Sequence, residues 1–185
     1  MYRAVIDNAK AKMEKTKEFY QKDMLSLRAG RANPQILDKI VVDYYGTSTP
    51  LKQMGNINAP EPRLLTISLW DPKAIPLVEK AIQKSDLGLN PSNDGKMIRL
   101  VVPELNEERR RDLTKVVRKG AEEAKVAVRG VRRDAMEQFK KLKKDSQITE
   151  DDQRKAEEEM QKLTDSMIKD LDKIAAEKEK EIMEV

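Results

Sequence analysis

Basic side chains recur at a regular spacing in one long segment of the chain. Arg111, Arg118, Lys125 and Arg132 follow one another at intervals of seven residues. Two turns of an α-helix contain about seven residues, so these side chains form a ridge along one side of a helix. A planar guanidinium holds a phosphate with two donors, and the ridge is therefore suited to binding a nucleic-acid backbone.

Neighbouring arginines extend this ridge into a patch. The candidate RNA-binding residues of the segment are Arg110, Arg111, Arg118, Lys125, Arg129, Arg132 and Arg133. No aromatic residue accompanies them, which favours recognition of the backbone and shape of a folded RNA over stacking on bases. The alternative is that the ridge pairs with acids of the following helix and only solvates the protein, because exposed ion pairs are common.

The charges of the chain are strongly segregated. The 185 residues include 37 Lys and Arg and 33 Asp and Glu, for a formal net charge of +4. Residues 109–144 contain 14 basic and 5 acidic residues, whereas residues 145–185 contain 7 and 14, so the local net charges are +9 and −7. The total charge does not indicate a nucleic-acid partner, but the basic segment does.

The composition excludes several classes of function. The chain has no Cys and no His, so we expect no disulfide, no metal site built from these residues, no thiol catalysis and no Ser-His-Asp triad. No apolar run approaches the roughly 18 residues of a membrane span, and the N-terminus has no apolar signal core. These absences predict a cytoplasmic protein that is not an enzyme and needs no metal and no cofactor.

Three amphipathic helices are predicted to carry the charged residues. Apolar residues recur at steps of three and four over residues 2–29, 105–145 and 149–184. Each apolar stripe is too narrow to be buried alone, so we expect the helices to pack as one bundle. The expected buried stripe of the second helix is Leu113, Val117, Ala121, Ala124, Val128, Val131, Ala135 and Leu142.

Local signals mark the ends of these helices. Gly30 ends the first apolar pattern, and Pro34 prevents its quick resumption. Thr149 is followed three residues later by Asp152, which predicts a variant of the capping box at the start of the third helix.

The middle of the chain is of a different kind, because all eight Pro residues lie between residues 34 and 103. Composition there predicts short strands, one short helix and loops. The expected elements are strands over residues 39–45, 49–54, 65–69 and 97–102, a turn over 46–48, a helix after Pro72 and a loop over 89–95.

These elements predict an α+β fold with two domains. A discontinuous three-helix bundle of residues 1–30 and 105–185 is interrupted by a small α+β domain of the β/α/β type over residues 31–104. Two short crossings near residues 30–34 and 103–106 join the domains, and we expect them to act as a hinge. The hinge residues are Gly30, Ala32, Asn33, Pro34, Pro103, Glu104 and Leu105.

Longer motifs are spread over nearly the whole chain. They are RAGRANP at 28–34, YYGTSTPL at 44–51, EKAI at 79–82, SDLGLNP at 85–91, EERRRDL at 107–113, VAVRGVRRDA at 126–135 and QKLTD at 161–165. Together they resemble the bacterial ribosome recycling factor (ribosome-releasing factor) family. Gly130 departs from the family pattern, which has a larger residue there; a glycine inside a helix costs about 1 kcal/mol relative to Ala.

This resemblance implies a function in protein synthesis. It implies an L-shaped molecule of tRNA-like dimensions whose bundle binds rRNA of the large ribosomal subunit, and it adds Arg28 and Arg31 to the rRNA-binding residues. It also implies that the protein, together with elongation factor G, which hydrolyses GTP, splits the post-termination ribosome so that mRNA and tRNA leave. We expect it to act as a monomer and to do no chemistry itself.

A second hypothesis comes from another class of protein. The chain would then be a coiled-coil-like interaction adaptor, with no ribosome role, whose acidic third helix docks on a basic partner. The translation factor predicts salt-sensitive binding to ribosomal RNA, whereas the adaptor predicts protein complexes that form without ribosomes.

Overall fold

The chain forms two compact units. The computed structural model describes residues 1–184, of which Met1–Met24 and Arg111–Met183 make up the larger unit and Leu25–Arg110 the smaller one. The boundaries expected from the sequence, after residue 30 and before residue 105, both lie inside the smaller unit. Within residues 25–30, Arg28 donates to the carbonyl oxygens of Leu87 and Pro103, and the Leu25 carbonyl oxygen accepts from Asn33.

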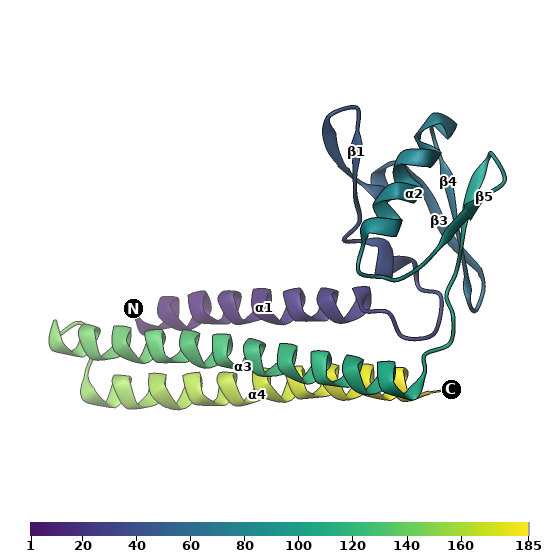
Figure 1. Cartoon of the computed structure of the whole chain (residues 1–185). Coiled ribbons are helices and arrows are strands. Elements are labelled where there is room, and N and C mark those ends of the chain that lie inside the picture. The colour runs from purple at the N-terminus through teal and green to yellow at the C-terminus, as the bar shows by residue number, and fades with distance from the viewer. Residues whose placement is uncertain (185) are drawn as a thin grey trace. The chain divides into compact units, whose positions relative to one another are not determined.

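Three long helices build the larger unit. They are α1 (Tyr2–Ser26), α3 (Glu107–Lys144) and α4 (Glu150–Met183). They lie side by side, with α3 antiparallel to both α1 and α4 (Figure 1). Each helix buries one apolar stripe against the other two, as the sequence periodicity predicted.

The buried stripe of α3 differs from the expected one at its C-terminal half. Phe139 is fully buried although the sequence pattern did not include it, whereas Val131 and Leu142 are only half-buried. Phe139 follows Ala135 by four residues and continues the same face of the helix. Leu142 belongs to the last turn of α3, where a helix end leaves its side chains less covered.

The predicted capping box at the start of α4 is confirmed. The backbone N–H of Thr149 donates to Oδ2 of Asp152 at 3.1 Å, and the N–H of Asp152 donates to Oγ1 of Thr149 at 3.1 Å. Two backbone donors that the helix leaves unpaired are thereby satisfied. The reverse turn between α3 and α4 is fixed by these bonds.

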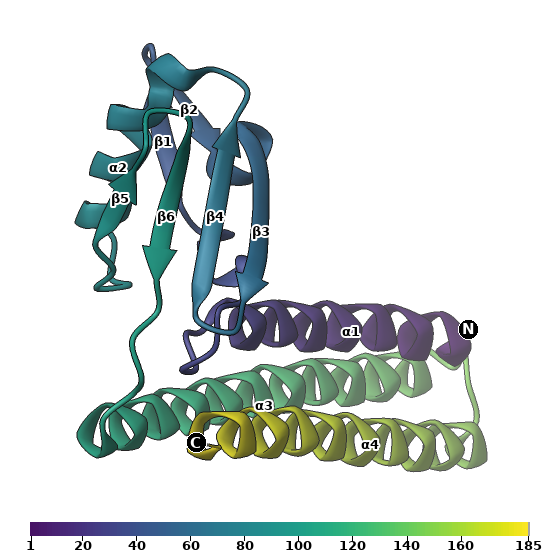
Figure 2. The same ribbon diagram turned by 90° about the vertical axis from the view of Figure 1, so that its right-hand side faces the viewer.

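The smaller unit contains a four-stranded antiparallel sheet of order β3-β4-β6-β5, a separate hairpin β1-β2, and the helix α2. Its apolar core includes Leu65 and Ile67 of the sheet together with Val78 and Ile82 of α2, and Figure 2 shows the four strands of the sheet side by side, with α2 next to β5. The elements are η1 (Pro34–Leu37), β1 (Val41–Tyr44), β2 (Thr47–Pro50), η2 (Leu51–Gln53), β3 (Gly55–Glu61), β4 (Leu64–Leu69), η3 (Pro72–Ala74), α2 (Ile75–Lys84), β5 (Pro91–Asn93) and β6 (Met97–Val101).

Two strands of this sheet were missed by the sequence analysis, and one turn was placed a residue late. β3 has mostly exposed residues and includes Pro60, so it lacks the alternation of a half-buried strand. β5 has three residues on the sheet edge, inside the segment that was expected to be a loop. The β1-β2 turn is Tyr45-Gly46, whose φ angles of 49° and 84° suit a two-residue hairpin turn.

Within residues 1–184, no helix is long and apolar enough to cross a membrane.

Candidate nucleic-acid interface

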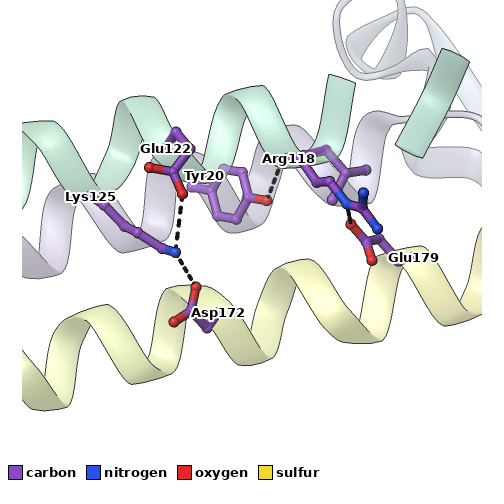
Figure 3. Close-up of polar contacts among 7 residues, drawn as sticks. Tyr20, Arg118, Glu122, Lys125, Asp172 and Glu179 are labelled. Atoms are coloured by element: carbon purple, nitrogen blue, oxygen red, sulfur yellow. Dashed lines mark hydrogen bonds and ion pairs between the residues drawn. The ribbon is translucent and has the colours of Figure 1, made fainter. Parts of the chain in front are cut away.

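One side of α3 bonds to α4 through two cations of the predicted ridge. Arg118 Nε donates to Glu179 Oε1 at 2.8 Å. Lys125 Nζ pairs with Asp172 of α4 and lies 3.3 Å from Glu122 Oε1 of its own helix. Figure 3 shows both side chains directed toward α4. We call Arg118 and Lys125 the α4-facing pair.

The two members of this pair differ in exposure. The side chain of Lys125 is 14% exposed and that of Arg118 is 71% exposed. The hydrogen bond with Asp172 raises the pKa of Lys125, although burial opposes this, and the hydrogen bond with Glu179 raises the pKa of Arg118. Both groups are held as cations and each is paired with a carboxylate of α4, Lys125 in a largely buried position and Arg118 at the surface.

Arg132 lies at the edge between this side of α3 and the solvent. Its side chain is half-buried, and Nη1 donates to Oε1 of Gln161 on α4 at 3.2 Å. A guanidinium has five N–H donors, so this single bond leaves most of its hydrogen-bonding capacity available. Arg132 therefore combines a contact to α4 with the ability to bind an external phosphate.

Other cations of α3 have no such contacts. Lys115, Lys119, Arg129 and Arg133 are exposed, and in the described part of the chain their side chains form no ion pair or hydrogen bond. At about 100° per residue, Lys115, Lys119 and Arg133 fall on the side of the helix away from the buried stripe, and Arg129 falls about 20° from Arg118 at the edge of that side. We call these four residues the open row.

Sequence reasoning chose the seven-residue repeat and therefore missed Lys115 and Lys119. That repeat follows the edge of the buried stripe, where α4 supplies partners for the cations. The usable signal would have been the angular position opposite the stripe, where exposed Val126 also lies, with 64% of its surface accessible.

The remaining predicted cations are distributed over both units. Arg31 is exposed and Arg110 is half-buried, and both belong to the smaller unit, whereas exposed Arg111 begins the larger unit's part of α3. Seven of the nine predicted residues, Arg110, Arg111, Arg118, Lys125, Arg129, Arg132 and Arg133, therefore lie on α3, whereas Arg28 and Arg31 belong to the smaller unit.

Arg28 is placed differently from a surface cation. Its side chain is half-buried; Nη2 donates to the carbonyl oxygen of Pro103 at 3.0 Å and Nη1 to that of Leu87 at 3.3 Å. Burial, and after it the nearby positive charge of Arg109, lowers the pKa of Arg28. The guanidinium is used inside the smaller unit.

The expected hinge residues also lie in the smaller unit. Gly30 has a positive φ of 43°, a conformation that glycine adopts without strain. Asn33 caps η1 by accepting the Gln35 N–H at 3.0 Å, and Pro34 is the first residue of η1. Leu105 is buried, at 7% exposure.

Acidic residues of α4 are bonded to α1 as well as to α3. Arg3 of α1 forms a two-donor contact with Glu159, with distances of 2.7 and 3.2 Å. Lys17 Nζ lies 3.3 Å from Asp170 Oδ2. The negative charge of α4 therefore compensates basic residues on both of its neighbours.

Most of the chain matches one family of known proteins. Residues 20–183 match the family described as "Ribosome recycling factor". The chain belongs to the ribosome recycling factor family. Similar relatives are the ribosome-recycling factors of Syntrophomonas wolfei, 56% identical, and Bacillus subtilis, 55% identical, each over 185 residues with full coverage of both chains.

Solved structures of ribosome recycling factors agree with this assignment. A solution structure of the ribosome recycling factor is 42% identical, with a TM-score of 0.79 and coverage of 100% of this chain and 98% of the other. The Thermus thermophilus ribosome recycling factor, in a structure with Escherichia coli elongation factor G bound to the post-termination complex, is 43% identical, with a TM-score of 0.69 and full coverage of both chains. The family and the α+β fold predicted from the sequence are confirmed.

Proposed function

We propose that this chain binds rRNA of the large ribosomal subunit through the exposed side of α3 and, together with elongation factor G and GTP, splits the post-termination ribosome into subunits. The observation that carries the rRNA contact is the open row of α3. Its four cations are exposed and uncompensated in the described residues, whereas the α4-facing pair is bonded to carboxylates of the bundle.

A phosphate contact needs donors that are directed to the solvent and are not already engaged. Arg129 and Arg133 meet this requirement and are spaced one turn apart on α3. Arg132, which lies between them in sequence, retains donors beyond its bond to Gln161. These three arginines form the centre of the proposed interface, and Lys115 and Lys119 extend it along the helix.

The partner and the event are supported by a relative. A ribosome recycling factor of the same fold is described with elongation factor G on a post-termination complex. By this analogy the GTP is hydrolysed by elongation factor G in the cytoplasm, and the recycling factor contributes binding and mechanical work as a monomer. The smaller unit is proposed to move during splitting.

The adaptor hypothesis has less support. It needs an acidic surface on α4 that is available to a basic partner, but Glu159, Asp170 and Asp172 are bonded to cations of α1 and α3. Glu179 is bonded to α3 in the same way. With Glu150, which pairs with Lys143, five of the twelve acidic residues of α4 are therefore paired with α1 or α3.

The test is a splitting reaction with purified components. Post-termination ribosomes are mixed with this protein, elongation factor G and GTP, and subunit formation is followed by light scattering and by sedimentation. Subunits should form only when all three are present. Intact ribosomes in the complete mixture would refute the proposed function, and protein complexes formed equally well without ribosomes would favour the adaptor.

A further inference from the structure

Both connecting segments of the chain are bonded to one turn of the smaller unit. The N–H of Ala32 donates to the Pro62 carbonyl oxygen at 2.7 Å, and the N–H of Val102 donates to the Arg63 carbonyl oxygen at 2.8 Å. The Arg63 side chain also pairs with Glu104 at 3.1 Å. The turn between β3 and β4 therefore holds the segment that enters the unit and the segment that leaves it.

Arg28 links the same two segments through separate hydrogen bonds. It belongs to the entering segment, and its two terminal nitrogens donate to the carbonyl oxygen of Pro103 in the leaving segment and of Leu87 in the loop before β5. Its buried Nε has no hydrogen-bond partner within residues 1–184. Burying a guanidinium that has one unbonded N–H costs free energy. The two bonds to carbonyl oxygens that accompany this burial therefore indicate a specific structural arrangement.

We infer that Arg28 is a positioning residue that fastens both connecting segments to the smaller unit, so that residues 27–33 and 102–106 move as part of it; its functional consequence rests on the proposed splitting activity. Slack connections would absorb a displacement of the smaller unit by bending. Fastened connections pass the displacement on to the helices α1 and α3, of which α3 carries the proposed ribosome-binding surface.

The competing role for Arg28 is a phosphate contact like that proposed for the open row. That role requires free donors and a solvent-directed cation. Arg28 is instead half-buried and donates to two backbone oxygens of its own unit. Arg31 is the matched comparison, because it is three residues away, exposed, and without a side-chain partner among the residues described.

The first experiment measures hydrogen exchange of the Ala32 and Val102 amides in the full chain. In Arg28→Ala, both should exchange about tenfold faster or more, because two charge-assisted bonds are lost. Arg28→Lys should be intermediate, since an ammonium lacks the planar fork. Arg31→Ala should leave both amides unchanged. Equal exchange in the wild type and Arg28→Ala would overturn the inference.

The second experiment separates binding from splitting. Arg28→Ala should keep the large-subunit affinity and its salt dependence but split ribosomes about threefold more slowly or worse. A flatter salt dependence with unchanged exchange would make Arg28 a phosphate contact, and a normal splitting rate despite faster exchange would remove its functional role. If the wild type itself does not split ribosomes, the proposed function fails, while the exchange comparison still decides whether Arg28 fastens the segments.

Discussion

The two charged sides of α3 contain the same types of residue and have different environments. On the side toward α4, Lys125 is largely buried and bonded to Asp172, and Arg118 is bonded to Glu179. Arg129, close to Arg118 around the helix, and Arg133, opposite the buried stripe, are exposed and have no bonded partner in the part of the chain that the structure describes. The comparison teaches that a regular repeat of basic residues does not identify which cations of a helix are left without a carboxylate partner.

The largest expected effect comes from the open row. Each of Arg129→Ala and Arg133→Ala should cost about 1–3 kcal/mol in affinity for large subunits. The double variant should flatten the plot of log affinity against log salt by nearly two units, because each neutralised phosphate contributes about 0.9 in duplex DNA. Binding across a salt series, with circular dichroism as the folding control, measures this.

Arg118→Ala is the matched control for that series. It removes one arginine from the same helix, but from the α4-facing pair, and should leave the salt slope nearly unchanged. If Arg118→Ala and Arg129→Ala flatten the slope equally, the two sides of α3 do not differ in RNA binding.

The next effect should appear in stability at the buried member of the α4-facing pair. Lys125→Ala removes a cation whose side chain is 14% exposed and bonded to two carboxylates. We expect a loss of about 1.5 kcal/mol in the free energy of unfolding, measured by urea denaturation, with little change in the salt slope of ribosome binding. If Lys125→Ala kept wild-type stability but bound large subunits more weakly, Lys125 would be an RNA contact and not a structural partner of α4.

A third prediction concerns the side of α3 that contacts α1. Tyr20 is buried; its hydroxyl donates to the Val117 carbonyl oxygen at 2.9 Å (Figure 3), and burial raises its pKa to about 12. In the unfolded chain the phenol ionises near pH 10. The unfolded state therefore loses this proton first, and the contribution of Tyr20 to stability falls as pH rises from about 10 to 12.

The variant Tyr20→Phe isolates this contribution. It should cost about 1 kcal/mol at neutral pH, because the Val117 carbonyl loses its donor, and should lose less of its remaining stability between pH 10 and 12 than the wild type. If the free energy of unfolding of the two proteins fell equally as pH was raised over this range, the loss would not come from the Tyr20 hydroxyl.

The smallest expected effect is a gain in stability on the open side of α3. Gly130 lies within the unbroken helix, and a Cβ there would meet no atom within 4 Å. Gly130→Ala should therefore stabilise the protein by about 0.5–1 kcal/mol. Gly120 is the control, since its Cβ would lie 3.1 Å from Tyr20 Cε2, and Gly120→Ala should gain less or lose stability.

Much of the fold could be predicted because it depends on local signals. Apolar periodicity gave the three long helices, and Thr149 with Asp152 gave a cap that the structure contains. β3 could not be recognised in this way, since pairing with β4 rather than its own pattern makes it a strand. Polar residues that contact distant parts of the chain, such as Arg28 with Leu87, leave no trace in a local pattern.

The sequence predicts the basic helix and its residue types, but not which of its cations pair with α4. Charge counts located the basic segment on α3. Which of its cations remain uncompensated depends on Asp172 and Glu179, which lie 47 and 61 residues beyond Lys125 and Arg118. Only the packing of α4 beside α3 reveals those pairs.

The larger unit is built from two segments that are far apart in the sequence, and this affects the order in which they pack during synthesis. Residues 25–110 are contiguous and can fold as soon as they leave the ribosome, whereas residues 1–24 find their partners only after residues 111–183 have been synthesised. At about 5–20 residues per second, the first helix waits roughly 8–30 s with its apolar stripe uncovered. Its apolar stripe is narrow and its other faces are rich in Lys and Glu; a high charge and a small apolar surface oppose aggregation.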